Sequence, residues 1–198
     1  PRLASVLQPV AEQVLEAMAT TAHPDGVLLT LPWPEPPASP RVQFVLALDR
    51  LQDPGNLGTL MRTALAAGVE EIWLAEGADP FQPKVLRASA GAALAMPCCR
   101  FDSFMRARRG GAQVVASVVA GGMPYWQLDW TRPTVLLLGN EGAGLAPDLL
   151  AVSSHRVTIP HSAAVESLNV AVAAAPLLLE RWRQLTGENA GQQPQQPR

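Results

Sequence analysis

The stretch Val157-Thr-Ile-Pro-His-Ser-Ala-Ala-Val-Glu-Ser-Leu-Asn-Val-Ala-Val-Ala173 decides how the rest of this chain is arranged. A short β-type run over residues 156–159 is stopped by Pro160, and a loop of small residues then leads into an apolar run of helical spacing. Three hydrogen-bonding side chains precede that run, namely Glu166, Ser167 and Asn169. A helix start needs only one capping side chain. The others therefore predict a ligand where strand, loop and helix start meet in an open α/β sheet.

A second motif, Val135-Leu-Leu-Leu-Gly-Asn-Glu-Gly-Ala-Gly-Leu145, is typical of a buried strand that ends in a tight glycine loop. Its Gly-x-x-Gly-x-Gly spacing differs from the dinucleotide fingerprint Gly-x-Gly-x-x-Gly. Because Glu141 would repel a phosphate, we expect a nucleoside beside it, with ribose hydroxyls or a cationic centre. By itself the motif is equally compatible with an ordinary glycine-rich turn.

A third motif lies near the start of the main domain, Leu48-Asp-Arg-Leu-Gln-Asp-Pro-Gly-Asn-Leu-Gly-Thr-Leu-Met-Arg-Thr-Ala64. A strand ends, a turn follows at Asp53, and Asn56 can cap the helix that carries Arg62. These last two residues are between one and two helical turns apart, so a loop over the helix start could bring both to one ligand. The alternative is that Asn56 is only a cap and Arg62 only a surface residue.

Around these motifs, short β-type runs alternate with helical runs, which predicts an α/β fold with a largely parallel sheet covered by helices. The expected strands are 42–48, 71–74, 97–100, 113–118, 134–138 and 156–159. The expected helices are 57–67, 83–93, 102–108, 146–153 and 165–185. Pro176 falls inside the last of these. We expect a bend without an end there, because no glycine or polar turn residue adjoins it to stop the helix.

The chain divides into four segments on composition. Residues 1–32 contain an amphipathic helix over 3–18 and a short strand over 26–31, and the proline-dense residues 33–40 form a linker. The main domain covers residues 41–186. Residues 187–198, rich in Gln and Pro, have nothing to bury and are expected to be disordered.

The composition of the chain argues against several classes of protein. The chain has 198 residues, of which 48% are hydrophobic, and a formal net charge of −2, which argues against broad, non-specific nucleic-acid binding. The only two cysteines are the neighbours Cys98 and Cys99, and we expect both to be reduced thiols, as in the cytoplasm. No apolar run is long enough to span a membrane, and no Cys and His spacing suits a metal.

In this order and at these strand ends, the three motifs resemble the SpoU (TrmH-type) RNA ribose 2′-O-methyltransferases of the SPOUT superfamily. The matching patterns are Asp-Pro-x-Asn-x-Gly-x-x-x-Arg-x-Ala, Gly-x-Glu-Gly-x-Gly and Ile-Pro-x-x-x-x-x-Glu-Ser-Leu-Asn-Val, and the resemblance covers about residues 42–182. Residues 1–32 look like the last part of the ribosomal-protein-like RNA-binding domain that often precedes this fold. Three positions depart from the family pattern: His161 stands where Met is usual, Ala163 where Gly is usual, and Ala171 where Ser is common.

The resemblance implies a SPOUT-type parallel sheet with helices on both faces and a C-terminal deep trefoil knot. It implies a homodimer, and S-adenosylmethionine, with no metal, bound in the knot. The backbone around Gly139, Ile159 and Leu168 would hold this cofactor, with Ser117 as a further candidate. The small residues Ala171 and Ala173–Ala175 suggest an interface helix, although burial against the chain's own sheet is the alternative.

The implied reaction is methyl transfer to a ribose 2′-hydroxyl of structured RNA. By resemblance Arg62 is the central catalytic residue, with Asn56, Ser167 and Asn169 orienting ribose and phosphate and Glu141 organising the loop or Arg62. We expect ribosomal RNA as the substrate, with transfer RNA as the alternative. A non-catalytic RNA-binding protein of the same fold and a nucleotide-binding α/β enzyme are the rival functions.

Overall fold

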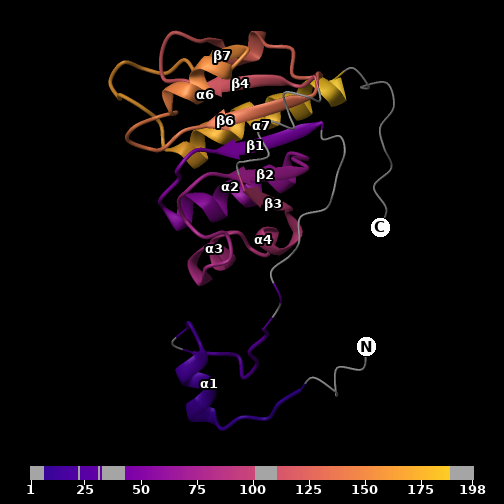
Figure 1. The fold of residues 1–198 in the computed structure, drawn as a ribbon, viewed down its shortest axis with the longest axis vertical. Helices are drawn as coiled ribbons and strands as arrows, with labels where there is room; N and C mark the ends of the chain where they lie inside the picture. Colours follow the sequence, from indigo (N-terminus) through magenta and orange to yellow (C-terminus); the bar gives the residue numbers. More distant parts are fainter. Residues whose placement is uncertain (1–6, 22, 31, 33–42, 101–110, 188–198) are drawn as a thin grey trace. The chain divides into compact units, whose positions relative to one another are not determined.

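One seven-stranded sheet, in which every pairing is parallel, forms the frame of the main unit (Figure 1). Its strand order is β3-β2-β1-β6-β4-β7-β5. The bounds are β1 (Phe44–Leu48), β2 (Glu71–Leu74), β3 (Cys98–Arg100), β4 (Gln113–Ser117), β5 (Met123–Pro124), β6 (Thr134–Leu138) and β7 (His155–Thr158). This computed structural model describes residues 7–21, 23–30, 32, 43–100 and 111–187. They belong to two separate units, Pro1–Pro34 and Glu35–Arg198.

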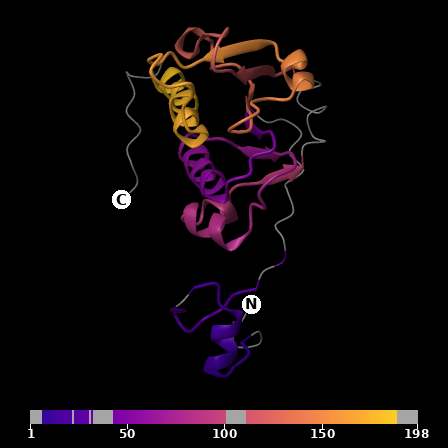
Figure 2. The ribbon, with the colours of Figure 1, turned by 90° about the vertical axis from the view of Figure 1, so that its left-hand side faces the viewer.

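Helices pack on both faces of the sheet. Those of the main unit are α2 (Pro54–Ala66), α3 (Pro83–Ala88), α4 (Ala92–Ala95), α6 (Pro147–Val152) and α7 (Val170–Gly187), together with the 3-10 helix η3 (Tyr125–Gln127). Seen from the side, α2 and α7 lie next to each other on one face, and α6 lies on the opposite face (Figure 2). The expectation of a parallel sheet with helices on both faces is therefore confirmed.

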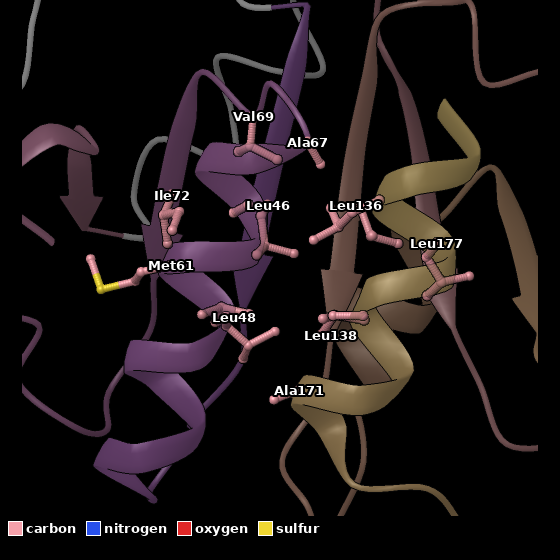
Figure 3. Close-up of a cluster of buried hydrophobic side chains, with 14 of the residues drawn as sticks. Leu46, Leu48, Met61, Ala67, Val69, Ile72, Leu136, Leu138, Ala171 and Leu177 are labelled. Atoms are coloured by element: carbon pink, nitrogen blue, oxygen red, sulfur yellow. The ribbon is translucent and has the colours of Figure 1, made fainter. Parts of the chain in front are cut away.

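The central strands β1 and β6 are apolar at every position but Thr134 because helices or loops cover both of their faces. Leu46 and Leu48 of β1 and Leu136 and Leu138 of β6 point toward α2 and α7, where they meet Leu177 and other helix residues (Figure 3). The alternate residues point the other way and pack against α6 and the loop before it, in a second cluster of Val45, Ala47, Val135, Leu137, Leu145 and Leu149. Two hydrophobic cores therefore cover the two faces of the sheet.

Several expected elements have other bounds. The strands β2 and β6 are confirmed as predicted, whereas β7 begins one residue earlier than expected, at His155. The single helix over 83–93 was wrong: α3 ends at Ala88 and α4 begins at Ala92 because Ala90 and Gly91 both have positive φ, 49° and 89°. The expected helix over 102–108, the linker 33–40 and residues 188–198 lie outside the described residues, and the knot stays a prediction.

The last helix begins later than predicted and runs through its proline. Its first helical residue is Val170, not residue 165, because the Asn169 side chain caps it, and residues 165–169 form a bend and loop. The helix continues past Pro176 to Gly187, so the expectation that the proline does not end the helix is confirmed, and the bend there stays a prediction. Ala171 and Ala174 are buried against the chain's own sheet, which was the alternative to an interface role for them.

The far end of α7 is anchored by hydrogen bonds to the segment between η3 and β6. The buried Arg181 guanidinium donates to the carbonyls of Trp130 and Arg132 and lies over the Phe44 ring. Gln184 accepts from the Trp130 amide at 2.8 Å. Burial lowers the pKa of Arg181 below its ordinary value, with the two acidic residues nearby opposing the shift. These contacts fix the axis of α7, and with it the position of its first turn.

The unit Pro1–Pro34 contains one short helix in its described part. The helix α1 (Glu12–Met18) is shorter than the expected 3–18, and it begins only after Pro9, which cannot donate a backbone hydrogen bond. The strand expected over 26–31 was wrong for residues 26–30, since no described strand is there to pair with it. No described helix of either unit is long and apolar enough to cross a membrane.

Cys98 offers a test of the core near β3. Burial, and then the neighbouring Cys99, raises the pKa of the Cys98 thiol to about 12, and neither cysteine forms a disulfide. Because folding favours the protonated form of this thiol, the Cys98 thiol contributes fully to the free energy of unfolding at pH values below the pKa of the unfolded thiol. That contribution is lost as pH rises from there through the pKa of the folded thiol. We expect a Cys99→Ser variant, which leaves only Cys98, to react at about pH 9 with iodoacetamide at least about tenfold faster when unfolded in urea than when folded. Equal rates would contradict a buried thiol.

Candidate active site

A cavity opens at the carboxyl ends of β4, β6 and β7, next to the first turn of α7. This is the edge at which ligands bind in open α/β sheets, because strand order and chain order diverge there. Its walls come from the ends of these strands and from the two loops after β6 and β7. The lining residues are Ser117, Val118, Val119, Leu138, Gly139, Asn140, Glu141, Gly144, Thr158, Ile159, His161, Ser167, Leu168, Val170 and Ala173.

Three side chains from the three motifs form one hydrogen-bonded chain beside the cavity. The Asn169 amide nitrogen donates to Asn56 Oδ1 at 3.0 Å, and the Asn56 amide nitrogen donates to Glu141 Oε1 at 2.9 Å. Asn169 Oδ1 in turn accepts from the backbone amides of Ala171 and Val172, at 2.9 and 3.3 Å, and so caps α7. The chain therefore joins the start of α2, the glycine loop and the start of α7, which are far apart in sequence.

Asn56 does not cap α2, although its sequence position had left open that capping was its only role. Asp53 takes that place: its Oδ1 accepts from the backbone amide of Asn56 at 2.7 Å. Pro54, at the first helical position, has no amide that needs a partner. The Asn56 side chain is thereby left to bond Glu141 and Asn169, and a purely capping role for Asn56 is excluded.

The glycine loop after β6 is held by two residues that sequence reasoning missed. The buried carboxylate of Asp49 accepts from the Ala146 amide at 2.8 Å and from the Arg50 guanidinium. Asn140 Oδ1 accepts from the amides of Gly142 and Ala143, and its amide nitrogen donates to the Arg50 carbonyl at 2.9 Å. The signal for Asp49 was a carboxylate placed directly after a fully apolar strand.

Gly139 lets the loop close on itself. A Cβ at this position would lie 2.3 Å from both the Gly144 carbonyl carbon and the Leu145 amide nitrogen. Asn140 and Gly144 also exchange two backbone hydrogen bonds, of 3.1 and 2.9 Å. Any side chain at residue 139 would push this small antiparallel bridge away from the strand end, and the loop backbone could no longer face the cavity in this form.

The family of the chain follows from comparison with known proteins. The model of the SpoU rRNA Methylase family matches residues 43–179. The chain belongs to this family. A crystal structure of an AdoMet-bound rRNA methyltransferase from Sinorhizobium meliloti aligns with a TM-score of 0.69 and 41% identity, over 74% of this chain and 58% of that chain.

Two curated relatives extend the match. An uncharacterized tRNA/rRNA methyltransferase of Synechocystis is 45% identical over 88% of this SpoU chain and 66% of its own length. The 23S rRNA (guanosine(2553)-2′-O)-methyltransferase RlmP of Bacillus subtilis is 35% identical over 85% of this chain and 69% of its own length. The resemblance inferred from the motifs is confirmed, and with it the SpoU fold.

The SpoU site brings together most of the residues predicted for it. All four candidates for cofactor contact, Gly139, Ile159, Leu168 and Ser117, line the cavity, as do Glu141 and Ser167. Asn56 and Asn169 adjoin it through their bonds to Glu141. Glu166 is exposed and lies outside the lining, so of the Glu-Ser-Leu-Asn motif only the last three residues reach the site.

Arg62 is the exception, because no contact joins it to the others. It is exposed on α2, and within the described residues it makes no hydrogen bond or ion pair. It lies six residues, between one and two turns, along the helix from Asn56, and Thr59, one turn before it, is also exposed. An exposed, unpaired guanidinium can bind a phosphate or stabilise a developing negative charge on a partner molecule.

The SpoU cavity suits S-adenosylmethionine better than a phosphate-bearing cofactor. Its walls are largely apolar, and among the described residues that line it there is no Lys or Arg to pair with phosphate groups. Glu141 adds a negative charge that would favour a cationic ligand and repel a phosphate. Within the described part of the chain no three His, Cys, Asp or Glu side chains gather as metal ligands would.

Proposed function

We propose that this chain transfers a methyl group from S-adenosylmethionine to a ribose 2′-hydroxyl of structured RNA, with ribosomal RNA as the substrate. The observation that carries the proposal is the hydrogen-bonded chain Glu141–Asn56–Asn169 beside an apolar cavity without Lys or Arg, with Arg62 exposed on the helix that carries Asn56. The membership in the SpoU family and the printed activity of the Bacillus subtilis relative support the same reaction.

When bound, S-adenosylmethionine supplies an electrophilic methyl group on a sulfonium. The backbone of Gly139, Ile159 and Leu168 would hold it, with Ser117 at the end of β4 as a further contact. No metal is needed, because the positive sulfur already makes the methyl group reactive. The apolar walls would keep water from the methyl group before the RNA arrives.

The side chains around the cavity would hold the RNA and stabilise its 2′-oxygen. A guanidinium is a very weak acid and rarely gives up its proton. Arg62 would therefore clamp the adjoining phosphate and stabilise the developing alkoxide, and the proton would leave to solvent or a neighbouring group. Asn56, Ser167 and Asn169 would orient ribose and phosphate, while Glu141 keeps the glycine loop in place through its bond to Asn56.

The direct test is transfer of a labelled methyl group from S-adenosylmethionine to total ribosomal or total transfer RNA from a strain that lacks the protein. We expect label in ribosomal RNA, at a 2′-O-methylated nucleotide located by alkaline hydrolysis and primer extension. Label in transfer RNA alone would favour the alternative substrate. If calorimetry showed cofactor binding but neither RNA was labelled, the proposed methyltransferase activity would be contradicted. Binding of RNA without binding of the cofactor would favour a non-catalytic RNA-binding protein.

We also propose that residues 1–32 belong to an RNA-binding unit and that the protein acts in the cytoplasm. The described part of this unit leaves several large apolar side chains exposed and none of α1 buried, and such an exposed apolar surface is typical of an interaction site. The exposed side chains are Leu7, Val10, Val14, Met18, Val27, Leu28 and Leu29.

We further propose a homodimer, and α7 supports it with an exposed apolar stripe. Val172 is 61% exposed, Leu179 47% and Trp182 51%, and helical spacing places them along one side. We expect light scattering at micromolar concentration to give a dimer mass, and Leu179→Glu to shift it toward the monomer, because a charge replaces an apolar contact. The matched control is Leu94→Glu, on α4, where the exposed leucine is not part of this stripe. A monomeric mass for the unmodified chain would refute the dimer.

A further inference from the structure

His161 occupies a chemically unusual position in the wall of the cavity. It follows the Ile-Pro pair at the end of β7, and its ring lines the cavity with Ile159 and Leu168. Its Nδ1 is 2.7 Å from the Ile159 carbonyl oxygen. Since a carbonyl can only accept, Nδ1 carries the hydrogen, and Nε2 is the nitrogen that gains or loses a proton. Nε2 has no hydrogen-bond partner among the described residues.

Few charges face this ring. Three of the elements around it contribute no titratable side chain to the lining. They are the end of β4 with Ser117, Val118 and Val119, the first turns of α7 with Val170 and Ala173, and the end of β7 with Thr158. The loop after β6 contributes Glu141, and the loop of His161 itself carries Glu166 outside the lining. Among the described residues that line the cavity, His161 is therefore the one side chain able to carry a positive charge.

We propose that protonated His161 pairs with the carboxylate of the methyl donor, so that the affinity of the cavity for S-adenosylmethionine depends on pH. This rests on the proposed function. The donor is positively charged at its sulfur and its amine and negatively charged at its carboxylate, and Glu141 can favour only the positive groups. A carboxylate in the same cavity needs a cation or a donor, and Nε2 becomes one when it is protonated.

The test is calorimetric titration of the whole chain with S-adenosylmethionine at about pH 5.5 and at about pH 8.0, on either side of the range in which histidine titrates. Because the ring is exposed on one side, we expect binding to be only about two- to fivefold tighter at the lower pH. His161→Gln should bind with the weaker affinity at both values. His161→Arg, which stays charged, should bind with the tighter affinity at both.

Two controls isolate the carboxylate and the residue. Decarboxylated S-adenosylmethionine should bind the unmodified chain with no such dependence, because it lacks the group that His161 pairs with. His155→Gln, at the opposite end of β7, should keep the full dependence on pH. The proposal is overturned if the unmodified chain binds equally well at both values, or if His161→Gln or the decarboxylated donor keeps the difference. No binding of S-adenosylmethionine under any condition would instead overturn the proposed function.

Discussion

Arg62→Ala is expected to lose methyl transfer by about 10²–10³-fold, while the dissociation constant for S-adenosylmethionine changes less than about twofold. The two effects separate because Arg62 lies on the outer side of α2 and does not line the cavity. Its proposed partners are the RNA phosphate and the developing 2′-alkoxide, which the cofactor alone does not provide. Single-turnover transfer to ribosomal RNA, with calorimetry for the cofactor, measures both quantities on one preparation.

The lysine variant tests how Arg62 works. Lysine keeps the positive charge but not the planar fork, so Arg62→Lys should also lose most of the activity. Near-normal turnover in this variant would show that positive charge alone suffices, and it would contradict the proposed role of Arg62 as a bidentate clamp on the RNA phosphate. Arg132→Ala is the matched control, because Arg132 is an exposed arginine just before the amino end of β6, away from the cavity, and its loss should leave transfer unchanged.

Gly139→Ala is expected to weaken S-adenosylmethionine binding by about tenfold or more. The new methyl group would lie 2.3 Å from backbone atoms of Gly144 and Leu145, which cannot swing aside as a side chain would. Relieving such a clash costs about 1–3 kcal/mol, and here it must displace the loop that forms one wall of the cavity. Calorimetry measures the affinity, and thermal unfolding without ligand separates loss of binding from loss of the fold.

The matched control for Gly139 lies three residues away in the same loop. At Gly142 the nearest atom to a new Cβ would be Asn140 Oδ1 at 3.6 Å, an ordinary contact, and the Gly142 amide would keep its hydrogen bond. Gly142→Ala should therefore bind the cofactor almost normally. If both variants bound equally well, the close approach at Gly139 would not matter for the site.

The central strands could be predicted because they are buried on both faces and are therefore largely apolar runs. The strands β2 and β6 have the expected bounds for this reason. Gly91, a residue typical of helix ends, is the one signal for the break between α3 and α4, whereas the positive φ of Ala90, an ordinary helix former, has no signal in its local sequence. The start of α7 was predicted too early because three candidate caps, Glu166, Ser167 and Asn169, precede the apolar run, and the sequence does not show that Asn169 is the one that caps it.

The candidate site was predictable as a set of motifs and not as a set of contacts. The glycine loop and the Ser-Leu-Asn segment were found from sequence, yet nothing in the spacing shows that Asn56 and Asn169 are hydrogen-bonded to each other. That bond depends on Asp53 capping α2, which makes the Asn56 side chain available. Asp49 was missed because a single carboxylate after a strand has no pattern of its own, although it holds the Ala146 amide at the base of the loop.

The cap of α7 also sets the direction of the hydrogen bonds in the site. Backbone amides at a helix start can only donate, so Asn169 must turn its oxygen toward Ala171 and Val172 and its nitrogen toward Asn56. Asn56 must then accept from Asn169 and donate onward, and Glu141 receives at the end. An Asp at residue 169 could cap the helix equally well but could not start this sequence. The start of α7 thus determines the donor-to-acceptor direction of the whole hydrogen-bonded chain. The carboxylate of Glu141 can end that chain because it only accepts hydrogen bonds.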